Sequence, residues 1–74
     1  MTHAAFARAL DHFEGKQAKL ADAIGTSQQR ISYIMVNKNP CPPDLVLKTE
    51  RATGISRHEL RPDLYPIEHG QAAA

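Results

Sequence analysis

The sequence predicts an all-α fold of five short helices. A chain of 74 residues buries only about 60% of its unfolded surface, and so thin a core suits a small helical fold better than a two-layer α/β enzyme. Apolar residues recur at three- and four-residue spacing in successive segments. Glycine or proline separates these segments, as expected of residues that end helices.

The first helix is expected to start after Thr2, a possible N-cap, and to run to about Glu14. Its apolar stripe consists of residues spaced i, i+4 and i+7, namely Phe6, Leu10 and Phe13. Gly15 would end the helix. Aromatic residues at this spacing are more often core residues than a ligand site.

The second helix is expected over residues 16–24, and a short turn follows it. Leu20 and Ile24 lie at i and i+4 and form its apolar face. Ala21 is small, at a place where two helices must approach closely. Gly25 tolerates the positive φ that commonly follows a helix end.

The third helix is expected over residues 28–36, with Ser27 as its N-cap. Ile31 and Ile34 give it an inner face, and we expect Val36 to face the remaining core or the following loop. Two helices joined by a short glycine-containing turn have the layout of a helix-turn-helix, whose second helix enters the DNA major groove.

The fourth helix is expected after a proline-rich stretch at residues 38–43, which no helix would cross. Before this stretch, Asn37 can take the left-handed conformation as a C-cap. Pro43 suits the first turn of the fourth helix. The helix would run to about Thr53 and stop at Gly54.

The fifth helix is expected to begin at Ser56, which forms a predicted capping box with Glu59. Ile55 and Leu60 would form the accompanying hydrophobic contact, and Pro62 follows the helix. Residues 1–67 are therefore expected to make one DNA-binding domain. The predicted disordered C-terminal tail spans residues 68–74.

The positive charge is concentrated in the helix-turn-helix segment. The net charge of the whole chain is only +1, but residues 16–38 hold four basic side chains and one acidic one, a net charge of +3. Such a distribution favours binding to phosphates. Without the motif, an ordinary solvated surface would be the simpler interpretation.

The same segment resembles the DNA-binding domains of the Cro/CI phage repressor family. The matching residues are Gln17, Ala18, Leu20, Ala21, Gly25, Thr26, Ser27, Gln28, Ile31 and Ser32. The closing stretch, residues 50–66, looks like the YdaS-like branch of these regulators, which are small proteins of phages, prophages and related mobile elements. Thr49 departs from the Ile or Val usual there, and some members are named as toxins.

The resemblance implies a lambda-repressor-like helix-turn-helix domain that binds double-stranded DNA in a sequence-specific way, most simply a Cro-like repressor of phage or prophage origin. The candidate base-reading residues are Gln28, Gln29, Arg30, Ser32 and Tyr33. Arg30 could read guanine or hold a phosphate, and partial burial of Tyr33 against the neighbouring helix is the equal alternative. The candidate phosphate-binding residues are Lys16, Gln17, Ser27, Asn37 and Lys38.

One such module reads few base pairs, so we expect a homodimer or higher homo-oligomer on a palindromic operator. The candidate self-association residues are Leu64, Tyr65 and Ile67. Packing of this apolar run back onto the core is the equal alternative.

An alternative function is that of a toxin–antitoxin component acting mainly through a protein partner. An enzyme is not expected, because neither a nucleophile turn nor a glycine-rich phosphate loop occurs. The four histidines and Cys41 have no metal-ligand spacing, so no metal or cofactor is expected. A single cysteine suits a reducing compartment, and we expect a bacterial cytoplasmic location, at the nucleoid when DNA is bound.

Overall fold

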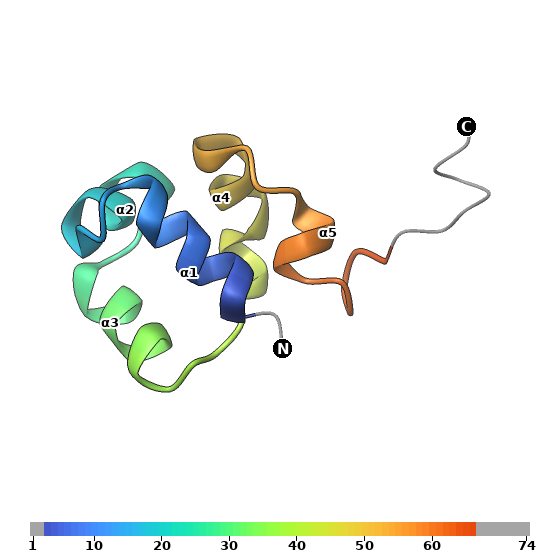
Figure 1. Ribbon diagram of the computed structural model, residues 1–74, viewed down its shortest axis with the longest axis horizontal. Coiled ribbons are helices and arrows are strands. Elements are labelled where there is room, and N and C mark those ends of the chain that lie inside the picture. Colours follow the sequence, from blue (N-terminus) through green and yellow to red (C-terminus); the bar gives the residue numbers. More distant parts are fainter. Residues whose placement is uncertain (1–2, 67–74) are drawn as a thin grey trace.

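The computed structural model describes residues 3–66, which form helices connected by short loops (Figure 1). The elements in chain order are α1 (His3–His12), α2 (Gln17–Ile24), α3 (Gln28–Val36), the 3-10 turn η1 (Pro43–Leu45), α4 (Val46–Thr53) and α5 (Arg57–Leu60). There is no strand between residues 3 and 66. The predicted all-α fold of five short helices is confirmed. The predicted cap at Thr2 and the tail predicted at 68–74 lie outside the described residues.

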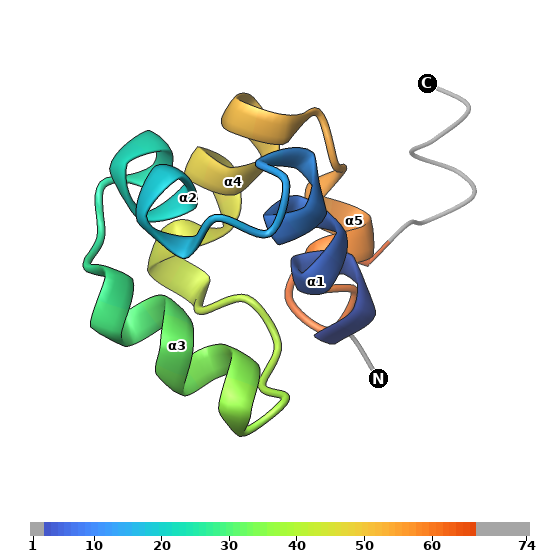
Figure 2. The same ribbon diagram turned by 60° about the vertical axis from the view of Figure 1, so that its left-hand side comes forward.

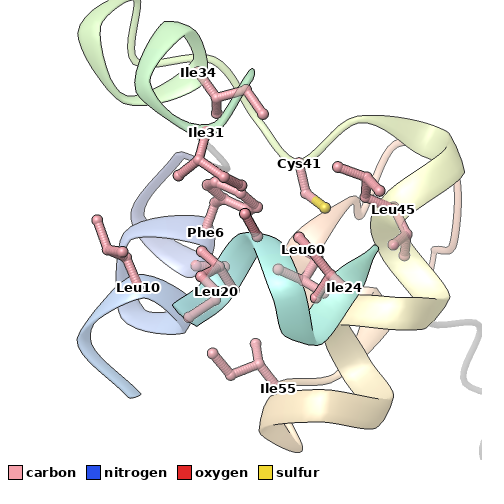
Figure 3. Packing of buried hydrophobic residues seen from close by; sticks show 14 residues of the cluster. Phe6, Leu10, Leu20, Ile24, Ile31, Ile34, Cys41, Leu45, Ile55 and Leu60 are labelled. Carbon is pink, nitrogen blue, oxygen red and sulfur yellow. The ribbon is translucent and has the colours of Figure 1, made fainter. Parts of the chain in front are cut away.

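The helices meet in one hydrophobic core, seen from close by in Figure 3. Phe6 of α1, Leu20 of α2 and Ile31 of α3 are all completely buried. Leu60 brings α5 into the same cluster. α2 packs against both α3 and α4. It therefore connects α3, which lies at the edge of the molecule, with the rest of the core. None of the helices between residues 3 and 66 is long and apolar enough to cross a bilayer.

The first helix ends two residues earlier than predicted, at His12. Two consecutive residues, Glu14 (φ 61°) and Gly15 (φ 74°), take the left-handed conformation and reverse the chain there. The Gly15 amide donates to the Leu10 carbonyl oxygen at 3.0 Å, which satisfies one open carbonyl of the helix end. Glycine therefore ends the helix as predicted, and Glu14 belongs to the turn instead of the helix.

The C-terminal end of α3 differs from the prediction at two residues. Asn37 is not left-handed (φ −89°), and Lys38 takes that conformation instead (φ 53°). The Asn37 side-chain amide donates to the Tyr33 carbonyl oxygen at 2.9 Å and so closes the last turn. Val36 is 77% exposed, because Ile31 and Ile34 fix the inner face of α3 and turn Val36 outward.

The side-chain hydroxyls of two threonines in α4, Thr49 and Thr53, differ in their hydrogen bonding. Thr49, at the position where Ile or Val was expected, is completely buried. Its hydroxyl lies 3.7 Å from the Cys41 sulfur, the one hydrogen-bond partner recorded for it among the described residues. Thr53 donates its hydroxyl to the Thr49 carbonyl oxygen at 2.7 Å and accepts the Ile55 amide at 3.2 Å. The first hydroxyl is thus weakly bonded, and the second closes the end of α4.

The predicted capping box of α5 forms only in part. Ser56 does cap the helix, but its hydroxyl accepts the amide of His58 at 3.0 Å and not that of Glu59. The Glu59 carboxylate pairs with Arg8 of α1 at 2.7 Å. The hydrogen bond from Arg8 and, to a smaller extent, the Ser56 backbone amide lower the pKa of Glu59, so the carboxylate serves both a distant helix and its own helix end.

Glu50, near the end of α4, provides a second cap for α5. One oxygen of its carboxylate accepts the Arg57 backbone amide at 3.0 Å, and the other accepts the Arg57 Nε at 3.0 Å. The backbone amide and the guanidinium of Arg57 lower the pKa of Glu50. The short α5 is therefore fastened to α4 at its N-terminus.

Candidate nucleic-acid interface

The turn between α2 and α3 has the geometry that a helix-turn-helix needs. Gly25 ends α2 in the left-handed conformation (φ 72°), and its amide donates to the Ala21 carbonyl oxygen. Ser27 is extended (φ −92°, ψ 151°), and its hydroxyl accepts the Arg30 amide at 3.1 Å. The predicted glycine turn and serine N-cap are both confirmed. They reverse the chain within three residues and fix where α3 starts.

One side of α3 is left uncovered by the other helices, and α3 lies at the edge of the molecule (Figure 2). Gln29, Tyr33 and Val36 follow one another at helical spacing on the side opposite Ile31 and Ile34. Tyr33 is 63% and Val36 77% exposed. We call the surface formed by Gln29, Ser32, Tyr33 and Val36 the outer face of α3.

The predicted base-reading glutamines are free to act on a ligand. Gln28 and Gln29 are exposed in the first turn of α3. Ser32 is half-buried, and Tyr33 is exposed, so the alternative of its partial burial against the neighbouring helix does not occur. The outer face thus combines hydrogen-bonding side chains with the aromatic ring of Tyr33 and the apolar side chain of Val36. Sequence reasoning missed Val36, because its apolar side chain suggested the core.

Arg30, the remaining predicted base reader, is engaged within the protein. Its Nη1 and Nη2 donate to the two carboxylate oxygens of Asp44 at 2.9 and 2.8 Å. The hydrogen bonds of this pair raise the pKa of Arg30 and lower the pKa of Asp44. In the sequence, Asp44 follows Pro43 at the expected start of the fourth helix, where an acidic residue suits the helix dipole. No local pattern pairs residues 14 positions apart.

The predicted phosphate-binding residues lie at helix ends and differ in how free they are. Lys16 precedes α2, is exposed, and lies 3.6 Å from the Glu14 carboxylate. Gln17 is the half-buried first residue of α2. Lys38 is exposed after α3. The Ser27 hydroxyl and the Asn37 amide are already used in closing α3 at its two ends.

The described residues of the predicted self-association run, Leu64 and Tyr65, differ in their burial. Tyr65 is partly buried against the core, and its carbonyl oxygen accepts a hydrogen bond from His58 Nδ1 at 2.6 Å. The guanidinium of Arg57 lies over its ring, 5.8 Å from the centroid. Leu64 is 45% exposed, whereas Ile67 lies outside the described residues. Of the two described members of this run, Leu64 is therefore the more exposed.

Between residues 3 and 66, no group of three histidine, cysteine, aspartate or glutamate side chains is arranged to hold a metal ion. A protein-family model with the description bacterial toxin YdaS matches residues 5–68 of the chain. No curated protein matches the chain, and no solved structure matches it.

Proposed function

The chain belongs to the family described as bacterial toxin YdaS, and we propose that this member is a sequence-specific double-stranded DNA-binding regulator instead of an enzyme. The observation that carries the proposal is the outer face of α3 with the two free glutamines at its start. Its hydrogen-bonding groups, on the side of α3 that the other helices leave uncovered, suit the edges of bases in a major groove.

In the proposed complex, α3 lies in the major groove. The amides of Gln28 and Gln29 can donate and accept at once, which matches the adenine N6 and N7 edge. Ser32 can hydrogen-bond a base edge, and the exposed ring of Tyr33 can lie against a thymine methyl group. Val36 extends the apolar part of this surface toward the end of α3.

Phosphate contacts would fix the position of α3 along the groove. Lys16 and Gln17 lie at the start of α2, where open amides and the helix dipole favour an anion. Lys38 supplies a positive charge after α3. Ser27 and Asn37 contribute through groups that their capping bonds leave free.

A single domain of this size reads few base pairs, so we propose a homodimer on a palindromic operator with half-sites about one helical turn apart. Leu64 is a candidate for the dimer contact. A Cro-like repressor of prophage origin, working in the bacterial cytoplasm, is the biological role that fits this mechanism. The resemblance to Cro/CI repressors stays a prediction.

A second candidate function is that of a toxin–antitoxin component that acts through a protein partner. The description of the matched family names a toxin. The exposure of Tyr33 and Val36 on one helix face also provides the apolar and aromatic anchors that protein interfaces favour. The two candidates differ in what α3 touches.

Selection of bound duplexes from a random pool at fixed moderate salt tests the proposal. The wild type is expected to yield a palindromic consensus. The Gln28→Ala/Gln29→Ala variant should lose or alter it, with each change costing roughly 1–3 kcal/mol on the best site. Circular dichroism would check that the variants are folded.

Gln17→Ala is the matched control, because the same substitution at a proposed phosphate contact should weaken binding to all sequences without changing the consensus. Weak, salt-sensitive enrichment without a consensus would contradict the proposal and favour the protein-partner function. An unchanged consensus in the double variant would refute the placement of α3.

A further inference from the structure

We propose that Asp44 determines which bases α3 reads, by holding Arg30 away from guanine. The inference rests on the proposed DNA-binding function. It makes Asp44 a specificity-determining residue that acts through Arg30 and touches no base itself.

The pairing geometry occupies the group with which arginine reads guanine. Arginine recognises guanine by placing two parallel N–H groups on O6 and N7. In this structure the two terminal nitrogens, Nη1 and Nη2, already bind the two oxygens of Asp44 at 2.9 and 2.8 Å. A carboxylate and the guanine edge compete for the same fork. The pair therefore excludes end-on guanine recognition by Arg30.

The surroundings of the pair favour retention by Asp44. Asp44 follows Pro42 and Pro43, whose rings restrict φ, so the backbone that carries the carboxylate is stiff. The Arg30 side chain is long and flexible, so its guanidinium can reach η1 from the first turn of α3. The restricted position of Asp44 thus determines where the Arg30 guanidinium lies.

The pair is open to solvent near the start of α3. The side chains of Arg30 and Asp44 are 41% and 62% exposed. Arg30 is next to Gln29, the first residue of the outer face of α3. If the Arg30 guanidinium were free, it could reach into a groove occupied by α3. In the pair, the Asp44 carboxylate neutralises its charge. An exposed pair of this kind contributes little free energy, so releasing Arg30 should change the affinity for DNA only a few-fold.

Four proteins test the inference by duplex selection and by binding to the selected sites: wild type, Asp44→Asn, Arg30→Ala and the double variant. Asp44→Asn keeps the shape of the side chain and removes its charge. It is expected to create a guanine preference at one position in each half-site and to tighten binding about two- to fivefold. Arg30→Ala alone should leave the wild-type consensus unchanged, and the double variant should show no guanine preference.

Asp22→Asn is the control for general charge, since Asp22 is exposed on α2 and forms no ion pair with any described residue. It can tighten binding through weaker repulsion of phosphates, but it should create no new base preference. If Asp44→Asn changes the consensus no more than Asp22→Asn does, or if Arg30→Ala removes a guanine already preferred by the wild type, the inference is wrong.

The ion pair can also be measured without DNA, which distinguishes a missing ion pair from a missing DNA-binding function. NMR titration should give Asp44 a lower pKa in the wild type than in Arg30→Ala, because the guanidinium stabilises the carboxylate. Equal values would refute the pair and with it the inference, while the DNA-binding proposal stands. A confirmed pair in a wild type without any consensus would refute the proposed function and the inference together.

Discussion

Replacing threonine by valine should have opposite effects at two positions of α4, four residues apart. Thr49 is completely buried, and its hydroxyl has the Cys41 sulfur at 3.7 Å as its recorded partner. Thr53 uses its hydroxyl twice, toward the Thr49 carbonyl oxygen and the Ile55 amide. Valine has nearly the shape of threonine, so the comparison isolates the hydroxyl group.

The structure sets the size of each effect. Thr49→Val removes a buried hydroxyl with a weak partner and adds a buried methyl group worth about 0.8 kcal/mol. We expect a gain of about 1 kcal/mol in the free energy of unfolding. Thr53→Val removes two hydrogen bonds and leaves the Ile55 amide without its acceptor, which should cost about 1–2 kcal/mol. The two variants should differ by roughly 2–3 kcal/mol.

Urea unfolding followed by far-UV circular dichroism measures this difference, provided that the variants unfold with the same dependence on denaturant. In a domain of this size 1 kcal/mol corresponds to roughly 4–8 °C in Tm, so thermal melts should separate the variants clearly. A Thr49→Val variant destabilised as much as Thr53→Val would refute the reasoning, because it would mean that the Thr49 hydroxyl is fully satisfied in the core.

Two further predictions concern charge. Lys38→Ala should weaken binding to every duplex alike and reduce the slope of log K against log salt by about 0.9, the value for one phosphate contact; a salt titration of the affinity measures this, and a changed consensus would contradict it. Interactions with arginines or backbone amides lower the pKa values of Asp44, Glu50, Glu59 and Asp63, to about 2 for Asp63. Their stabilising contribution is therefore complete above the unfolded pKa values near 4 and is lost as the pH falls toward 2; urea unfolding at stepped pH should show that decline, and a flat profile would refute it.

The sequence predicted the features that depend on near neighbours. The bounds of α3 and the glycine and serine of its preceding turn follow from helical periodicity and from capping by residues within one turn. Ile31 and Ile34 are buried as predicted because their spacing matches the helical repeat. The identities of the candidate base readers come from the same local pattern, and their role remains a prediction.

The features that sequence reasoning missed depend on residues far apart in the chain. Arg30 meets Asp44, and Arg8 meets Glu59 across 51 positions. These contacts exist only after the helices have packed, so no spacing rule contains them. Glu59 was expected to bond its own helix, and its ion pair with Arg8 of α1 could not be read from the spacing of residues within α5.

The burial of Cys41 provides a way to time the opening of this molecule. It is the single cysteine of the chain and is completely shielded from solvent in the segment between α3 and η1. Burial also raises the pKa of its thiol, so little reactive thiolate is present in the closed state. An alkylating reagent can therefore modify Cys41 only when this segment lifts from the core. The rate of modification would report how readily the segment around Cys41 opens, without any probe having to be introduced.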